Sequence, residues 1–192
     1  MISKQQLRQQ CLQRRQALTA QHIQTYSQRI AQHLHHQFNT RYPNEALDIL
    51  CYHATPQEVQ TQNIFFSQAQ HRYYAPVTTH AGTMHWLRVE ANTPWQQGAL
   101  HIMEPQSDTP WQANIRPTLL LCPLVGFDWN GQRIGMGKGC FDRWLEHQQV
   151  YIQQRIGLAF SCQHCPSIPH EPHDIPLHAI ITEQGWHTCP NT

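Results

Sequence analysis

The chain has 192 residues, of which 40% are hydrophobic and only 13% are charged, and its formal net charge is +1 with neutral His. This balance excludes the broad basic surface that binds nucleic acid through phosphate neutralisation, so we expect no nucleic-acid partner. No apolar run is long enough to span a membrane, so we expect no membrane partner either. Gln and His replace much of the missing charge, and Lys4 and Lys138 are the only two lysines.

The N-terminal residues 1–6 lack the apolar core of a secretory signal. Seven cysteines are an odd number and too sparse for a disulfide scaffold. We therefore expect a cytoplasmic protein with reduced thiols. The length is typical of one domain, and no linker or repeat interrupts the chain, which predicts a single domain over residues 1–192. We expect a monomer, although nothing in the sequence reveals the oligomeric state.

The first forty residues show helical periodicity. Ser3 and Thr19 are suitable N-cap residues for two successive helices, and Pro43 ends the region. The expected apolar faces carry Leu7, Cys11, Leu12 and Leu18 in the first helix and Ile23, Tyr26, Ile30, Leu34 and Phe38 in the second.

The rest of the chain alternates short apolar runs with helical segments. We predict strands over residues 48–52, 73–77, 84–89, 118–125, 156–160 and 179–182, and helices over 61–70 and from Gly139 or Cys140 onward. The run 118–125 is apolar throughout, which is typical of a strand buried on both faces. This pattern predicts an α/β fold, a three-layer α/β/α domain with a mainly parallel sheet.

The segment between the 118–125 strand and the following helix is unusually rich in glycine. Four of the nine glycines fall between residues 131 and 139. Such a loop lets backbone N–H groups approach a phosphate, and the following helix adds its positive N-terminal end. Arg133 and Lys138 add charge, and Asp142 stands where a carboxylate can hold Mg²⁺. The loop lacks the Gly-Lys-Ser/Thr of a Walker motif and the third glycine of a dinucleotide fingerprint.

The loop from Arg133 to Arg143 closely resembles the nucleotide loop of the 5-formyltetrahydrofolate cyclo-ligase family, and the resemblance extends over nearly the whole chain. Five further short motifs match in the same order. They are Lys4 with Arg8, Glu58-Val59 with Thr61, Ile102–Pro105, Ile156–Gln163, and the C-terminal set Ile168-Pro169, His173-Asp174 and Ile181–Glu183.

The resemblance implies a fold of the type shared by sugar-phosphate isomerases and coenzyme A transferases. It also implies an enzyme that converts 5-formyltetrahydrofolate and ATP into 5,10-methenyltetrahydrofolate, ADP and phosphate, with Mg²⁺. The formyl oxygen would attack the γ-phosphate, and a neighbouring folate nitrogen would then close the ring. The partners are thus a folate and ATP, and the protein's task is positioning and charge stabilisation.

The resemblance also implies roles for individual residues. Lys138 and Arg133 would be catalytic, Asp142 and Asp174 would hold Mg²⁺, and His53 and Glu58 would contact the folate. The ATP-binding residues would be Lys4, Arg8, Arg133, Ile134, Gly135, Met136, Gly137, Lys138, Gly139, Cys140 and Phe141. The loop residues Met136, Gly137, Lys138, Gly139 and Cys140 would also form a wall of the folate site.

One departure from the family pattern concerns the aromatic pair that usually precedes the loop's Asp. Here the pair is Cys140-Phe141. Phe141 can still stack on a ring but lacks a phenol hydroxyl, and Cys140 removes one ring altogether. We expect this change to affect folate contacts more than ATP binding.

Two alternative functions remain open at this stage. Cys162, Cys165, His170 and His173 are four potential zinc ligands within twelve residues, so a zinc-binding module is one alternative. A sugar-phosphate isomerase-like enzyme of the same fold is the other, because fold alone does not decide function. A requirement for ATP distinguishes the cyclo-ligase from both.

Overall fold

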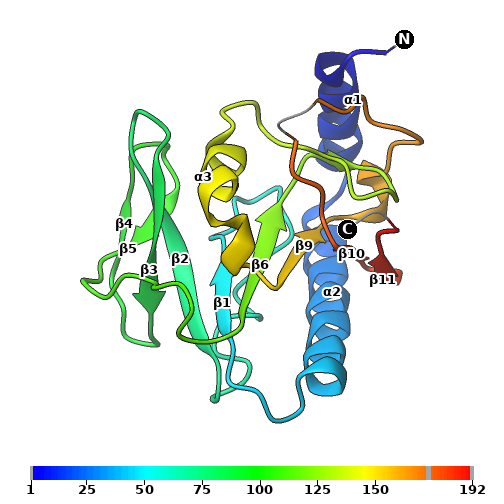
Figure 1. The fold of residues 1–192 in the computed structure, drawn as a ribbon. Helices are drawn as coiled ribbons and strands as arrows, with labels where there is room; N and C mark the ends of the chain where they lie inside the picture. The colour runs from blue at the N-terminus through cyan, green and yellow to red at the C-terminus, as the bar shows by residue number, and fades with distance from the viewer. Residues whose placement is uncertain (1, 172–173, 191–192) are drawn as a thin grey trace.

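The computed structural model describes residues 2–171 and 174–190 (Figure 1). Its two N-terminal helices, α1 (Lys4–Gln16) and α2 (Ala20–Arg41), begin directly after the predicted caps. The Ser3 hydroxyl accepts a hydrogen bond from the Gln6 N–H, and the Thr19 hydroxyl accepts one from the His22 N–H. In each helix the third residue's side chain accepts from the cap's own N–H, which completes a capping box.

The centre of the fold is a seven-stranded sheet in the order β11-β10-β9-β6-β1-β2-β3. The strands β2, β1, β6, β9 and β10 are parallel, and the edge strands β3 and β11 are antiparallel to their neighbours. The bounds are β1 (Asp48–Cys51), β2 (Arg72–Thr78), β3 (Met84–Val89), β6 (Thr118–Pro123), β9 (Gln154–Leu158), β10 (Ala179–Thr182) and β11 (Gly185–Thr188). The prediction of a mainly parallel α/β sheet is confirmed.

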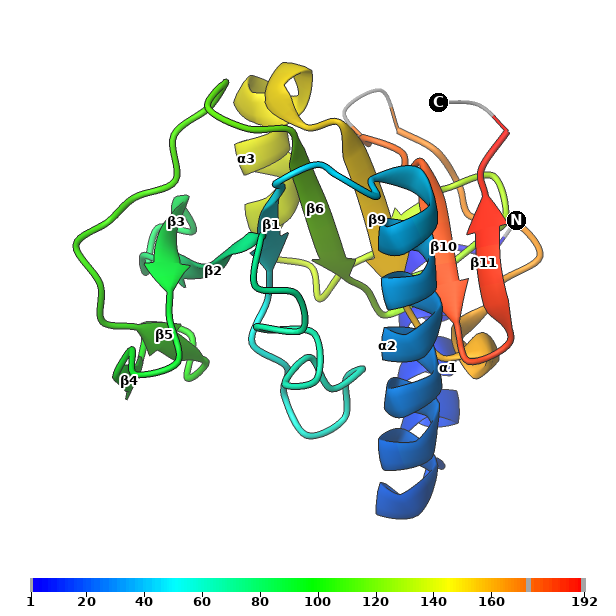
Figure 2. The ribbon, with the colours of Figure 1, turned by 90° about the horizontal axis from the view of Figure 1, so that it is seen from below.

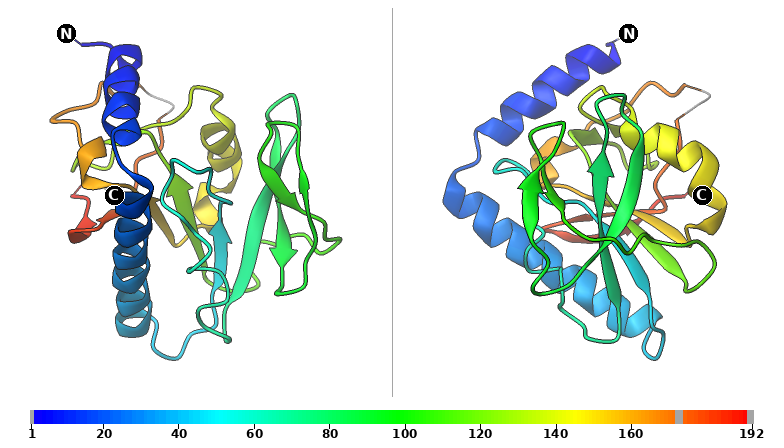
Figure 3. Two further views of the ribbon diagram at one scale, coloured as in Figure 1. Left: turned by 180° about the vertical axis from the view of Figure 1, so that it is seen from behind. Right: turned by 90° about the vertical axis from the view of Figure 1, so that its left-hand side faces the viewer.

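Helices cover both faces of this sheet. Figures 2 and 3 show α2 across one face and α3 (Cys140–Gln148) on the other. Successive residues of a strand point to opposite faces, so Leu119 and Leu121 of β6 pack in the α2 core and Leu120 packs in the α3 core. Both faces of the central strands are therefore buried, which explains why their sequences are apolar throughout.

Smaller elements surround the sheet. The pairs β4 (Trp95–Gln97) with β5 (Met103–Pro105), and β7 (Gly126–Phe127) with β8 (Arg133–Ile134), are antiparallel, and η1 (Gln149–Tyr151) and η2 (Ser161–Gln163) are single 3₁₀ turns. Helix α1 packs against η2 and β7. Within residues 2–171 and 174–190, no helix is long and apolar enough to cross a membrane.

The predicted helix over residues 61–70 is wrong. The segment is a series of turns, and Phe66 adopts a left-handed backbone conformation with φ of 61°, which a continuous α-helix does not tolerate. The Thr61 hydroxyl donates to the carbonyl of Tyr52 at 2.8 Å, so this segment is held to the end of β1. Apolar spacing alone did not reveal that side-chain contact.

Candidate active site

A cavity of about 420 Å³ lies beyond the carboxyl ends of β1 and β6. Its wall includes Tyr52 and His53, which follow β1, and Leu124 and Val125, which follow β6. On one side of β1 the sheet continues to β2 and β3. On its other side the sheet continues to β6, β9, β10 and β11. The cavity thus lies at a topological switch point, where open α/β sheets bind ligands.

The glycine loop forms the second wall of this cavity. Gly135, Met136, Lys138 and Gly139 all line it. Gly139 caps α3 with a φ of 63°, and no side chain caps the first N–H groups of that helix. Those N–H groups and the helix dipole favour an anion. The Lys138 side chain is exposed and makes no hydrogen bond or ion pair with any residue that the structure describes.

Arg133 and Asp142 reach the same cavity as an ion pair. Both Arg133 Nη1 and Nη2 donate to Asp142 Oδ1, at 2.8 and 2.6 Å. The Arg133 side chain is 7% exposed, whereas that of Asp142 is 33% exposed. The carboxylate therefore fixes the guanidinium within the wall through a single oxygen.

The two predicted N-terminal cations have different contacts. Lys4 Nζ donates to Asp174 Oδ2 at 2.5 Å and to Glu171 Oε2 at 2.6 Å. Burial lowers the pKa of Lys4, but its hydrogen bonds to these two carboxylates outweigh burial and raise that pKa overall. Arg8 Nε instead donates to the carbonyl of Gly135 at 2.8 Å. Arg8 thus supports the glycine loop, while Lys4 binds the carboxylates of Glu171 and Asp174.

The predicted folate residues lie on the opposite wall. His53 packs its ring 4.9 Å from that of Trp95, and burial lowers the pKa of this His. The Glu58 carboxylate accepts the N–H of Thr55 at 2.8 Å, and both residues line the cavity. The Glu58 N–H in turn donates to the carbonyl of Thr55, so Glu58 closes a turn.

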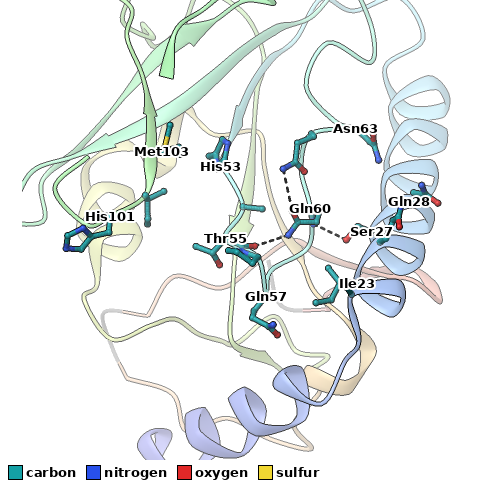
Figure 4. Close-up of a pocket in the computed structure, with 16 residues that line it drawn as sticks. Ile23, Ser27, Gln28, His53, Thr55, Gln57, Gln60, Asn63, His101 and Met103 are labelled. Carbon is teal, nitrogen blue, oxygen red and sulfur yellow. Dashed lines mark hydrogen bonds between the residues drawn. The ribbon is translucent and has the colours of Figure 1, made fainter. Parts of the chain in front are cut away.

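A larger and more open cavity of about 890 Å³ adjoins this wall (Figure 4). His53, Thr55 and His101 line both cavities. The N-terminal part of α2 forms its other side, where Ser27 accepts the N–H of Gln60. Several Gln side chains line it together with apolar residues, and no charged side chain is among the described lining residues. The folate wall is therefore open toward α2.

Of the predicted site residues, the 420 Å³ cavity brings together His53, Glu58, Arg133, Gly135, Met136, Lys138, Gly139, Cys140, Phe141 and Asp142. Ile134 is buried beneath the loop, and Lys4, Arg8, Gly137 and Asp174 are not part of the lining. A Cβ at Gly137 would lie 3.7 Å from Arg8 Cζ, so the Arg8 guanidinium lies next to the loop.

The altered aromatic pair is partly accommodated by the core. Phe141 makes an edge contact with Trp86 at a ring-centroid distance of 6.0 Å while it lines the cavity. The Cys140 thiol lies 3.9 Å from Arg143 Nη2. The cavity wall thus retains one aromatic face at this position.

Two charged residues of the lining received no role from the sequence. Glu104 is 6% exposed and accepts the N–H of Thr78 at 2.8 Å. Arg15 is 5% exposed and also lines the cavity. Arg15 follows Lys4 and Arg8 on the same face of α1, at spacings of four and seven residues, and this periodicity was a usable signal.

The proposed zinc ligands do not gather. The Cys165 thiol is buried and lies 3.3 Å from the Cys11 thiol of α1. The hydrogen bond from Cys165 lowers the pKa of Cys11 to about 6. His173 lies outside the described residues, and among the rest no three His, Cys, Asp or Glu side chains form a metal-binding group. Cys165 therefore has a neighbour that the zinc hypothesis did not include.

Fold and cavity together define a class: an α/β enzyme whose ligands bind at the switch point of a mostly parallel sheet. The family model for the 5-formyltetrahydrofolate cyclo-ligase family matches residues 1–183, and the chain belongs to that family of enzymes. This confirms the resemblance that the sequence motifs indicated, and it disfavours the sugar-phosphate isomerase alternative.

Individual relatives agree with this assignment. A 5-formyltetrahydrofolate cyclo-ligase of Haemophilus influenzae is 32% identical over 187 residues, which are 93% of this chain and 96% of that protein. One from Escherichia coli (strain K12) is 48% identical over 67 residues, and that match spans only 35% of this chain and 37% of the relative.

Solved structures show the same architecture. A 5,10-methenyltetrahydrofolate synthetase from Mycoplasma pneumoniae matches with a TM-score of 0.74 and 28% identity, over 95% of this chain and 99% of that one. A 5,10-methenyltetrahydrofolate synthetase from Aquifex aeolicus matches with a TM-score of 0.80 and 24% identity, over 98% and 94%, and this likeness supports the fold alone.

Proposed function

We propose that this protein converts 5-formyltetrahydrofolate to 5,10-methenyltetrahydrofolate in a reaction that requires ATP and Mg²⁺ and releases ADP and phosphate. The observation that carries this proposal is the composition of one cavity. It joins a glycine loop bearing Arg133 and Lys138 to a wall bearing His53 and Glu58. A phosphate donor and a folate bound on these two walls would face each other.

The reaction has two bond-forming steps. The formyl oxygen attacks the γ-phosphorus of ATP, and the bond from that phosphorus to the β-phosphate bridging oxygen breaks. The second folate nitrogen then attacks the formyl carbon and loses its proton, and the oxygen leaves with the phosphoryl group as inorganic phosphate. The new C–N bond closes the ring.

Within this scheme the chain supplies positioning and charge. Lys138 is an exposed point charge on a flexible stem, suited to follow a moving phosphoryl group. Arg133 is held rigidly by Asp142 and presents its remaining donors from the wall. Glu58 and His53 orient polar edges of the folate, and the aromatic face of Phe141 stacks on it. Arg8 supports the loop conformation through its bond to Gly135.

The carboxylates fit a Mg²⁺ ion to different degrees. Asp142 lies in the cavity wall and uses only Oδ1 for Arg133. Its Oδ2 would therefore suit a hard cation, and phosphate oxygens and water would supply the other ligands of that ion. Asp174 is bonded to the Lys4 ammonium and to the N–H of Glu171. Its proposed role therefore requires that Lys4 exchange this carboxylate for a phosphate. Bound Mg²⁺ would neutralise charge on the phosphates.

The proposal includes the setting in which the enzyme works. We infer a monomer, because one chain supplies both walls of the cavity. We also infer that the protein is a single domain and works in the cytoplasm. Its small-molecule partners are the folate and ATP.

The test is a spectrophotometric assay for methenyltetrahydrofolate. Purified protein is mixed with 5-formyltetrahydrofolate, with and without ATP and with and without Mg²⁺. We expect product only when both are present, with one ADP formed per methenyltetrahydrofolate. A folded protein that forms product equally well without ATP, or none at all, would disprove the proposal.

A further inference from the structure

The last turn of α1 places a buried cation at the cavity, and no carboxylate within the described part of the chain forms an ion pair with it. Arg15 is 5% exposed, and its side chain lines the 420 Å³ cavity beside Tyr52 and Val125. Its Nε atom is buried and makes no hydrogen bond with any part of the chain that the structure describes. Within that same part, Arg15 forms no ion pair.

Among the described residues, the Arg15 guanidinium makes one hydrogen bond, and that bond is long. Nη1 lies 3.5 Å from the carbonyl oxygen of Leu124, near the limit at which a contact of this kind counts as a bond. That carbonyl already accepts Gln163 Nε2 at 2.8 Å. The backbone thus leaves most of the hydrogen-bonding capacity of this guanidinium unused.

The nearby carboxylates of the cavity are engaged elsewhere. Glu58 accepts the N–H of Thr55, Glu104 accepts the N–H of Thr78, and Asp142 accepts two bonds from Arg133. A guanidinium cannot lose its proton to relieve its burial. A buried charge without a partner costs several kcal/mol, so a chain retains one where a ligand supplies the opposite charge.

We propose that Arg15 binds the phosphoryl group while it passes from the nucleotide to the folate, which makes Arg15 a catalytic residue of this enzyme. The inference rests on the proposed function, because it assigns one residue within that site. Arg15 lines the same cavity as the loop cations Arg133 and Lys138. Glu58, the proposed folate contact, lines that cavity too. A guanidinium between these two walls matches the planar array of phosphoryl oxygens.

The first experiment compares turnover and stability of Arg15→Met and Arg15→Lys, with Arg14→Gln as the matched control. Arg14 is the neighbouring residue of α1 and is exposed. It donates to the carbonyl of His164 and to the Cys11 thiol, and it is not part of the cavity lining. We expect Arg15→Met to lower kcat by about 100-fold or more, as removal of a preorganised donor to a developing charge does. Arg15→Lys should recover part of this loss, and Arg14→Gln should retain wild-type kcat.

Stability separates a catalytic role from a structural one. Met at position 15 removes an unpaired buried charge, so the ligand-free variant should unfold at the wild-type Tm or above it. A lower Tm together with a kcat within threefold of wild type would show that Arg15 only anchors α1, and would overturn the inference.

The second experiment identifies the ligand without turnover. Inorganic phosphate and 5-formyltetrahydrofolate, each alone, are titrated while Tm is followed. We expect phosphate to stabilise the wild type and Arg14→Gln but not Arg15→Met, and the folate to stabilise all three. If Arg15→Met instead loses the response to the folate and keeps that to phosphate, Arg15 binds a folate carboxylate and the phosphoryl assignment is wrong.

This arm also separates the two proposals. A wild-type protein that shows the expected phosphate response but no ATP-dependent product would contradict the proposed function and leave the oxyanion site at Arg15 supported. An active wild type with an unaltered Arg15→Met would contradict the inference alone.

Discussion

The two ends of strand β1 hold charges in opposite ways. At the amino end, the Asp48 carboxylate is fully buried and accepts Arg72 Nε and Nη2 at 2.7 and 2.8 Å. These residues are register partners at the starts of β1 and β2. At the carboxyl end, Lys138 and Arg15 have no ion pair within the described residues.

The difference teaches what each end is for. A bidentate pair between adjacent strands satisfies both charges within the chain and fixes the strand register. Unpaired cations around a cavity can pair their charge and hydrogen-bond donors with an anionic ligand. Without that ligand they lower stability, and the rest of the fold offsets this loss. Substitutions at the amino end should therefore alter stability, and substitutions at the carboxyl end should alter activity.

The largest expected effect is on turnover. Lys138→Ala should lower kcat by about 100-fold or more, because it removes the mobile positive charge from the phosphate wall. Unfolding should occur at the wild-type Tm, since this side chain is exposed and makes no bond within the described chain. The spectrophotometric assay for methenyltetrahydrofolate measures kcat, and thermal unfolding measures Tm.

A charge-preserving control accompanies this variant. Lys138→Arg should retain an intermediate kcat, because its rigid fork follows a moving phosphoryl group less well than an ammonium. Wild-type turnover in Lys138→Ala would show that the loop is not the phosphate site.

The amino end should respond in the opposite sense. Asp48→Asn should lower the free energy of unfolding by about 2–3 kcal/mol, because it leaves the Arg72 guanidinium without its buried counter-charge. Urea unfolding measures this loss. The kcat of the folded protein should be unchanged, because the pair lies at the far end of the strand from the cavity.

Asp108→Asn is the matched control for that experiment. Asp108 is exposed in a loop, so its substitution should change stability by less than about 0.5 kcal/mol. Equal stability of Asp48→Asn and Asp108→Asn would show that the pair at the amino end contributes nothing.

An intermediate effect is expected at the one ion pair of the cavity wall. Asp142→Asn should raise the Mg²⁺ concentration for half-maximal activity by about 10-fold, the loss typical of an altered metal environment. A Mg²⁺ titration of the assay measures it, with Asp108→Asn again as control. An unchanged titration would remove Asp142 from the proposed metal site.

The smallest effect concerns pH and two His residues at the amino ends of strands. His178 Nδ1 accepts the N–H of Arg155, and His71 Nδ1 accepts the N–H of Leu47. Burial, with Arg155 nearby, lowers the pKa of His178 from 6.5 to about 4. Burial, with Arg116 nearby, lowers that of His71 as well.

The sign follows from proton binding. Between pH 6.5 and about 4 the unfolded chain binds a proton at His178 that the folded chain excludes, so stability is complete above 6.5 and is lost as pH falls. Because the residue is only partly buried, we expect about 1–2 kcal/mol from it after solvent screening. We would measure the free energy of unfolding in urea at several pH values. It should depend less steeply on pH in His178→Gln than in the exposed-site control His80→Gln. Equal slopes would contradict the assignment.

Much of the fold was readable from local sequence. The caps Ser3 and Thr19 and the helix start after Gly139 depend on neighbouring residues, and the structure has them where they were predicted. The doubly buried strand begins at Thr118 as predicted and ends at Pro123, before the predicted end at residue 125. The glycine loop was identifiable for the same reason. The segment 61–70 was predicted wrongly because apolar periodicity does not report the side-chain bond that holds Thr61 to the carbonyl of Tyr52, nine residues earlier.

The site was readable in its parts but not in its connections. The sequence marked Lys4 and Lys138 as the only lysines, and the family pattern gave both a phosphate role. The structure separates them: Lys4 is bonded to two carboxylates from a segment more than 160 residues away, and Lys138 is not. Such partners are chosen by chain topology, which no spacing in the sequence encodes.

By itself, then, the sequence determined the family, the α/β layering and the position of the glycine loop between a buried strand and a helix, because each depends on residue types at short range. Only the tertiary structure decided which charges are neutralised and which face the cavity. Burial and counter-charge are properties of packing between distant segments. They make Arg15, an ordinary arginine in the sequence, a buried cation in the wall of the cavity.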